Sequence, residues 1–155
     1  VTLRDTDGNL VHLLQGDSGR CGSDVDKTDM FTGTFTGVFY EDDLAAAQQF
    51  YCDQLGLPLL KQQADLLLLQ AGDAQLLLRK RPANCTIGPS MIGLEASSVN
   101  KLYDRFSQRP DYKQAGVLRD TDFDARRLFQ MYDPSGNVVE IYAYLRNVRE
   151  EILLH

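Results

Sequence analysis

Glu140 is the first side chain to weigh for chemistry in this 155-residue chain. It follows the turn-forming segment Asp133-Pro134-Ser135-Gly136-Asn137, at a point where a strand is expected. Such a carboxylate can point inward and anchor a cationic or hydrogen-bonding ligand, or it can face water at a rim. A buried carboxylate needs a donor to compensate it, and Arg127 and Arg119 are the candidate partners.

Other candidates for chemistry are few. The two histidines are His12 and His155, and a lone strand histidine is more often a surface residue than a ligand. Cys85 lies in a connecting segment and is expected to be a small buried or loop residue. No Ser/His/Asp set or Cys/His pair falls within residues 34–144, so we assign no catalytic residue.

Composition narrows the class of protein. The net charge is −6, from 16 Lys and Arg against 22 Asp and Glu, which argues against a nucleic-acid surface. The basic run Arg79-Lys80-Arg81 is interpreted as a solvated strand end. No apolar run approaches the ~20 residues that cross a bilayer, and residues 1–20 lack the apolar core of a signal peptide.

Cysteine usage indicates a compartment. Cys21, Cys52 and Cys85 are odd in number and widely spaced, so they give neither a CxxC pair nor a disulfide framework. A reducing cytoplasm is therefore the expected location.

The alternation of apolar and polar residues predicts two units of the same order. Strands are expected at residues 34–41, 58–63, 65–70 and 75–80, with a helix after Asp43 that carries Leu44, Ala47, Tyr51 and Leu55 on one stripe. The order then repeats, with strands at 91–96, 112–118, 127–132 and 138–144 and a helix at 99–107. The sequence thus predicts an α+β fold of two βαβββ units, followed by a helix or tail at 145–155.

The first 33 residues precede these units. Residues 1–14 have the pattern of a β-hairpin, and residues 15–33, rich in Gly, Asp and Ser, have that of a linker. Residues 5–12 match residues 133–140, so that His12 aligns with Glu140. Either the hairpin is the end of a preceding module, or it fills a strand position elsewhere, or common turn residues match by chance.

Residues 34–144 resemble the vicinal oxygen chelate superfamily, which includes glyoxalases, bleomycin-resistance proteins and extradiol dioxygenases. The resemblance rests on Asp43-Leu44, Phe50-Tyr51 and Leu55-Gly56-Leu57-Pro58 at the start, and on the segment 133–137 with Glu140-Ile141 at the end. It implies paired βαβββ modules whose curved sheets form an eight-stranded, cup-shaped mixed sheet. It indicates the fold more firmly than an activity.

Enzymes of this superfamily hold a divalent metal with His and Glu side chains at matching places in both modules. The resemblance puts those positions at Thr36, about Leu76, Met91 and Glu140. Only Glu140 is an ordinary metal ligand, so we expect neither the usual metal centre nor another cofactor.

Strand periodicity then predicts the wall of the cup, because alternate residues share a face. A small-molecule site with mixed apolar, aromatic and polar walls is typical of such a cup. The predicted ligand-binding residues are Thr36, Val38, Met91, Gly93, Glu95, Glu140 and Tyr142.

Three functions remain open. The first is a metal-independent small-molecule-binding protein, like the drug-sequestering resistance proteins of the superfamily, with Glu140 or Glu95 selecting the charge of the ligand. The second is a metal-dependent lyase, isomerase or dioxygenase, and the third is a noncatalytic module of a larger tandem protein. We expect a homodimer or a tandem pairing of modules, and neither a nucleic-acid nor a membrane partner.

Overall fold

The computed structural model describes residues 2–4, 10–12 and 36–146. The chain divides into two compact units, residues 1–33 and 34–155. In the first unit, β1 (Thr2–Arg4) and β2 (Leu10–His12) pair antiparallel, as expected for a hairpin. The predicted turn, the linker at 15–33 and the tail at 147–155 lie outside the described residues.

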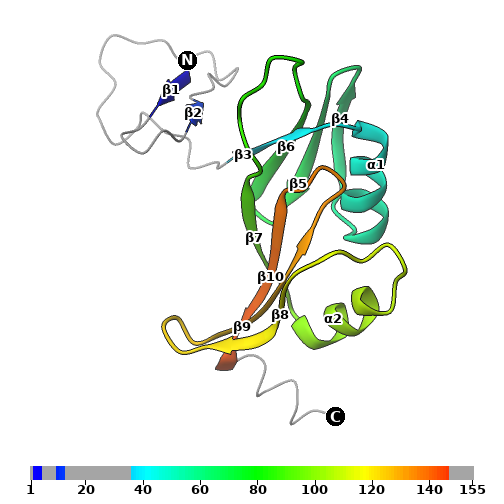
Figure 1. Ribbon diagram of the computed structural model, residues 1–155. Helices are drawn as coiled ribbons and strands as arrows, with labels where there is room; N and C mark the ends of the chain where they lie inside the picture. Colours follow the sequence, from blue (N-terminus) through cyan, green and yellow to red (C-terminus); the bar gives the residue numbers. More distant parts are fainter. Residues whose placement is uncertain (1, 5–9, 13–35, 147–155) are drawn as a thin grey trace. The chain divides into compact units, whose positions relative to one another are not determined.

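The second unit contains two consecutive βαβββ modules (Figure 1), and the fold class predicted from the sequence is confirmed. The first module contains, in chain order, β3 (Thr36–Glu41), α1 (Leu44–Gln48), η2 (Gln49–Gln54), β4 (Leu59–Gln63), β5 (Leu66–Ala71) and β6 (Ala74–Lys80). The second contains β7 (Met91–Glu95), α2 (Val99–Ser107), β8 (Gln114–Thr121), β9 (Arg126–Tyr132) and β10 (Val138–Tyr144).

Each module forms its own mixed sheet. The strand orders are β3-β6-β5-β4 and β7-β10-β9-β8, with the first strand of each module parallel to its last strand. The eight strands therefore form two hydrogen-bonded sheets of four, and not one continuous ladder. The sheets meet along β3 and β7, where a Cβ on Gly37 would lie 3.4 Å from Cδ1 of Ile92.

Local sequence explains the first helix. Oδ1 of Asp43 accepts hydrogen bonds from the amides of Ala45 and Ala46, so that Asp43, and not the neighbouring Asp42, caps the helix. The helix then widens into the π-helical turn η2, where the amide of Leu55 donates to the carbonyl of Phe50. Both Phe50 and Tyr51 are buried there, whereas an α-helical stripe predicts only Tyr51.

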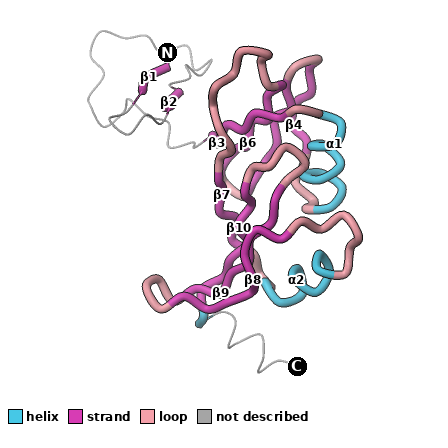
Figure 2. The backbone as a smooth tube through the Cα atoms, in the orientation of Figure 1, coloured by secondary structure: helices cyan, strands magenta, loops and turns pink. Residues whose placement is uncertain are grey.

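One core joins the two modules. Both helices lie on the same side of the strands (Figure 2), and the apolar faces of both sheets are packed beneath them. The largest fully buried members of this core are Tyr51, Leu67, Leu69, Leu76, Leu78, Phe106, Phe129, Met131 and Ile141. The opposite face of each sheet, called here the open face, carries mostly half-buried and exposed residues, although Glu140 and Leu128 are buried there. No helix within the described residues is long and apolar enough to cross a membrane.

Candidate functional site

The open face of the second sheet collects most of the predicted site. Strand register places its side chains in rows that run across β7, β10, β9 and β8. One row is apolar, one contains Glu140, one contains Tyr142 and the last contains Arg126. In order, the rows are Met91–Val138–Tyr132; Gly93–Glu140–Gln130–Gly116; Glu95–Tyr142–Leu128–Arg119; and Tyr144–Arg126–Thr121.

Glu140 lies at the centre of this face and is 7% exposed. Its Oε1 accepts a hydrogen bond from Nη1 of Arg126 at 3.2 Å, and its Oε2 accepts one from Nε2 of Gln130 at 2.8 Å. The guanidinium of Arg126 also lies 4.6 Å from the centroid of the Tyr142 ring and forms an ion pair with Asp124. Both oxygens of Glu140 therefore have donors, and its charge is compensated by a cation of the chain itself.

Two glycines make room for these side chains. A Cβ on Gly93 would lie 3.3 Å from the Tyr142 ring and 3.8 Å from Oε1 of Glu140. A Cβ on Gly116 would lie 2.5 Å from Oε1 of Gln130, which is closer than real Cβ atoms approach. The glycines thus let Tyr142 and Gln130 lie across neighbouring strands, close to Glu140.

Five of the seven predicted ligand-binding residues lie together on this face, in adjacent rows: Met91, Gly93, Glu95, Glu140 and Tyr142. Thr36 and Val38 lie on β3 in the other sheet, where they pair with Gln75 and Leu77.

The predicted partners of Glu140 were wrong. Arg127 lies on the side of β9 that faces the core and forms an ion pair with Asp120 at 2.6 Å. Arg119 lies on the open face, where its guanidinium is beside Gly116, and it forms no hydrogen bond with Glu140. The actual partner is Arg126. The β9–β10 register puts Arg126 opposite Tyr144, so that its side chain lies on the same face as Glu140.

The donor set does not fit the divalent metal of the superfamily. Thr36 pairs with Gln75 in the first module, as Met91 pairs with Val138 in the second. Glu140 is two residues after Val138, so its equivalent in the first module is Leu77, two residues after Gln75. Leu76, predicted for that position, instead points into the core and is fully buried. Neither leucine is a ligand, Met91 is an exposed thioether, and the oxygens of Glu140 are engaged.

The described residues form no metal site elsewhere either. Nowhere among them do three His, Cys, Asp or Glu side chains group in a way that could hold a metal. His12 pairs with Thr2 in the first unit, and its side chain lies outside what the structure describes.

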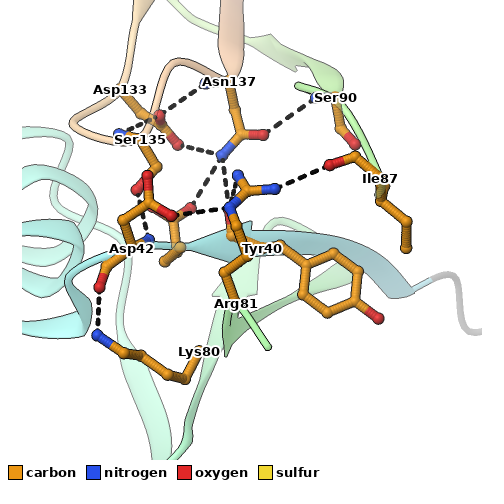
Figure 3. A network of polar contacts seen from close by, with 10 residues as sticks. Tyr40, Asp42, Lys80, Arg81, Ile87, Ser90, Asp133, Ser135 and Asn137 are labelled. Atoms are coloured by element: carbon orange, nitrogen blue, oxygen red, sulfur yellow. Dashed lines mark hydrogen bonds and ion pairs between the residues drawn. The ribbon is translucent and has the colours of Figure 1, made fainter. Parts of the chain in front are cut away.

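A second polar cluster joins the modules to each other (Figure 3). Asn137, 1% exposed, donates from Nδ2 to Oδ2 of Asp133 at 2.8 Å and to Oε1 of Glu41 at 3.2 Å. Its Oδ1 accepts a hydrogen bond from the amide of Ser90 at 3.0 Å, and the hydroxyl of Tyr51 donates to Oδ2 of Asp133 at 2.8 Å. The closing turn of the second module is thereby tied to the end of β3 and to η2.

Glu41 is the unusual member of this junction. It is fully buried, and its Oε2 has no hydrogen-bond partner among the described residues. Burial, reinforced by the negative charge of Asp133, raises the pKa of Glu41 to about 8. The raised pKa favours the protonated form of Glu41 near neutral pH.

The basic run at residues 79–81 is only partly the solvated strand end that was expected. Arg79 is exposed. Arg81 is half-buried, pairs with Asp42 at 2.8 Å and donates to the carbonyls of Tyr40 and Ile87 (Figure 3). Its role is to hold the connection between the modules against the end of β3, which the sequence did not reveal because the acceptors are backbone groups.

A cavity of about 180 Å³ lies on the helix side, away from the open face. Its wall includes Phe50 and Gln54 of η2, Phe106 of α2, and Tyr112 of the following loop. It brings together none of the predicted ligand-binding residues.

The described fold is that of paired βαβββ modules, and solved structures share it. A lactoylglutathione lyase from Agrobacterium tumefaciens matches with a TM-score of 0.60 at 23% identity, over 70% of this chain and 91% of that chain. TioX from Micromonospora sp. ML1 matches with a TM-score of 0.59 at 18% identity, over 72% of this chain and 98% of that chain. At these identities the likeness establishes the fold alone.

The family follows from the sequence itself. Residues 34–141 match the model of the Glyoxalase/Bleomycin resistance protein/Dioxygenase superfamily. The chain belongs to this superfamily, as the closing turn and Glu140 predicted. Comparison with curated protein sequences gives no match.

Proposed function

We propose that this protein binds a small organic molecule on the open face of the second sheet, without the divalent metal used by enzymes of its superfamily. The observation that carries the proposal is the pairing of Glu140 with Arg126 and Gln130. A divalent ion would have to displace a guanidinium, whereas an organic ligand can use the same groups as they stand.

The surroundings of Glu140 support an organic ligand. Met91, Tyr132 and Tyr144 all lie on this face and are 63%, 41% and 38% exposed. Exposed large apolar side chains gathered around a few fixed polar groups are the usual character of a binding surface. Tyr142, whose ring lies against the guanidinium of Arg126, adds an aromatic side chain to this surface and supports Arg126 there.

A ligand screen by thermal shift tests the location of this site. We expect compounds that stabilise the wild type to lose about tenfold or more in affinity for Tyr142→Ala, because the ring that supports Arg126 beside Glu140 is removed. Leu60→Ala is the control, since Leu60 is an exposed residue on β4 in the other sheet. Hits that bind both variants like the wild type would show that the site lies elsewhere.

We also propose that a second copy of the chain covers the open face. Small-molecule sites enclose most of their ligand. The described residues would contact a ligand on the open face from one side only. Phe123, fully exposed at the tip of the β8–β9 hairpin, is a further apolar group suited to burial in such a contact. Sedimentation at increasing concentration should show a dimer that Phe123→Ser weakens; a monomer throughout would contradict pairing.

We also propose that the protein is located in the cytoplasm. Its support is the cysteine pattern, with Cys52 and Cys85 both free thiols in the described residues.

A further inference from the structure

We propose that the cavity on the helix side binds a small, uncharged aromatic molecule, which accepts a hydrogen bond from the hydroxyl of Tyr112. This site is separate from the open face of the second sheet. Its walls come from both modules. Phe50 and Gln54 belong to η2 of the first module, and Phe106, Tyr112 and Met131 belong to the second. An occupant therefore contacts both modules at once.

The volume of the cavity fits one aromatic ring. It measures about 180 Å³, and an apolar cavity of about 150 Å³ is large enough to hold benzene. A water molecule occupies only about 30 Å³ of liquid volume, so one ordered water would leave most of the space unfilled. Phe50, Phe106 and Met131 give the wall an apolar part, and poorly ordered water beside such groups is displaced with a gain in affinity.

The π-helical turn shapes the wall that the first module supplies. In η2 an amide bonds to the carbonyl five residues earlier, as the amide of Leu55 bonds to Phe50. Residues five apart therefore lie near the same side, and Gln49 and Gln54 both line the cavity. An α-helix would separate these two side chains by about 140°. Turns of this kind are frequent at functional sites.

Tyr112 supplies the polar contact. Among the described residues that form the wall, it alone has a buried side-chain oxygen or nitrogen without a hydrogen-bond partner. Burial raises the pKa of Tyr112, so the phenol stays protonated and can donate. A buried donor that lacks a partner destabilises the fold. An acceptor on the ligand supplies the partner that the described chain does not.

Two carboxylates in the wall favour an uncharged ligand. Asp133 accepts a hydrogen bond from the hydroxyl of Tyr51 at 2.8 Å. Asp111 forms an ion pair with Arg109 at 2.9 Å, so neither carboxylate needs a cationic ligand. An anion in the cavity would meet both negative charges, and the exposed Lys113 is the one cationic residue of the wall. A neutral ring suits these surroundings better than either ion.

Methyl NMR of the full chain, with ¹³C at the methionine methyl groups, tests the site with three compounds. Benzonitrile has a ring and an acceptor, phenylacetylene has the same shape without a comparable acceptor, and benzoate carries a negative charge. Met131 lines the cavity, whereas Met91 is exposed on the open face, so their two signals distinguish the two sites. We expect benzonitrile to shift the signal of Met131 and not that of Met91. It should bind about fivefold more tightly than phenylacetylene, through one neutral hydrogen bond, and at least about tenfold more tightly than benzoate.

Two variants and a matched control locate the binding. Tyr112→Phe should make the affinities for benzonitrile and phenylacetylene equal, and the variant should be at least as stable as wild type because the lost hydroxyl has no partner. Ala46→Leu fills the cavity from α1 and should weaken both compounds by more than about tenfold. Ala45→Leu changes an exposed neighbour outside the wall and should bind both compounds like wild type.

Several outcomes overturn the inference. They are no shift of the Met131 signal with benzonitrile, equal affinity of wild type for benzonitrile and phenylacetylene, benzoate that binds as tightly as benzonitrile, and binding that Ala46→Leu leaves unchanged. Should Ala46→Leu fail to fold, the comparison in Tyr112→Phe decides, and a preference for benzonitrile that persists there contradicts the role of the hydroxyl. Compounds that shift Met91 and lose affinity for Tyr142→Ala bind the open face instead, which overturns this inference and supports the proposed function.

Discussion

Replacing Glu41 with glutamine will stabilise the protein at pH 8.5, with little effect near pH 4.5. Glu41 is fully buried, has one oxygen without a partner, and lies beside Asp133. Glutamine has nearly the same shape and carries no charge, so it removes the cost of keeping a carboxyl group in this junction. We expect the free energy of unfolding at pH 8.5 to rise by about 2–4 kcal/mol.

The sign follows from the raised pKa of Glu41. Between the ordinary glutamate pKa of 4.5 and the folded-state pKa of about 8, the native state holds a proton that the unfolded state has lost. Wild-type stability should therefore fall as pH rises through this window, by about 1.4 kcal/mol for each unit at most. Above pH 8 this contribution is lost, and Glu41→Gln should show none of the decline.

Urea unfolding of both proteins from pH 4.5 to 9 makes the comparison. Glu95→Gln is the matched control, because Glu95 is exposed and its loss should change stability by less than about 0.5 kcal/mol. A Glu41→Gln variant less stable than wild type at every pH would mean that Glu41 is ionised and stabilising, contrary to this account of the junction.

Asn137→Asp is expected to have the opposite and larger effect. The side-chain Nδ2 of Asn137 donates hydrogen bonds to both Glu41 and Asp133, and its Oδ1 accepts one from the backbone amide of Ser90. Aspartate keeps the acceptor, removes every hydrogen bond that Nδ2 donates, including one to the carbonyl of Tyr40, and adds a third acid to a site that is 1% exposed. Loss of buried bonds together with like-charge repulsion should cost about 4 kcal/mol or more at pH 7.

Thermal unfolding at pH 5 and pH 7 measures this effect. The loss should be smaller at pH 5, where protonation relieves repulsion among the acids. Asn84→Asp provides the control at an exposed loop position and should behave as wild type. If Asn137→Asp also unfolds like wild type at pH 7, the amide does not hold the two modules together.

Much of this fold could be predicted because its signals are local. The bounds of α2 and β10 agree with the sequence prediction, since Ser98 caps the helix and the turn at 133–137 precedes the strand. Gly136 has φ of +86°, which a turn residue without a Cβ adopts freely. Such features depend on neighbours in the chain and are visible in the sequence.

The site was predicted less completely because its contacts depend on register. Choosing Arg126 over Arg127 requires knowing which face of β9 meets Glu140, and a shift of one residue exchanges the faces. The same one-residue uncertainty put Leu76 where Leu77 lies. The junction joins Glu41 to Asn137 across 96 positions of the sequence, and nothing near either residue reveals the other.

The central claim is that Arg126 and Gln130, and not a divalent metal, satisfy Glu140. It is tested most directly by the metal content of protein purified without chelators, before and after incubation with Fe, Mn, Ni and Zn. We expect no metal above background in any sample, because the described residues bring no group of three possible metal ligands together at Glu140 or elsewhere. Close to one metal per chain, lost in Glu140→Gln, would contradict it.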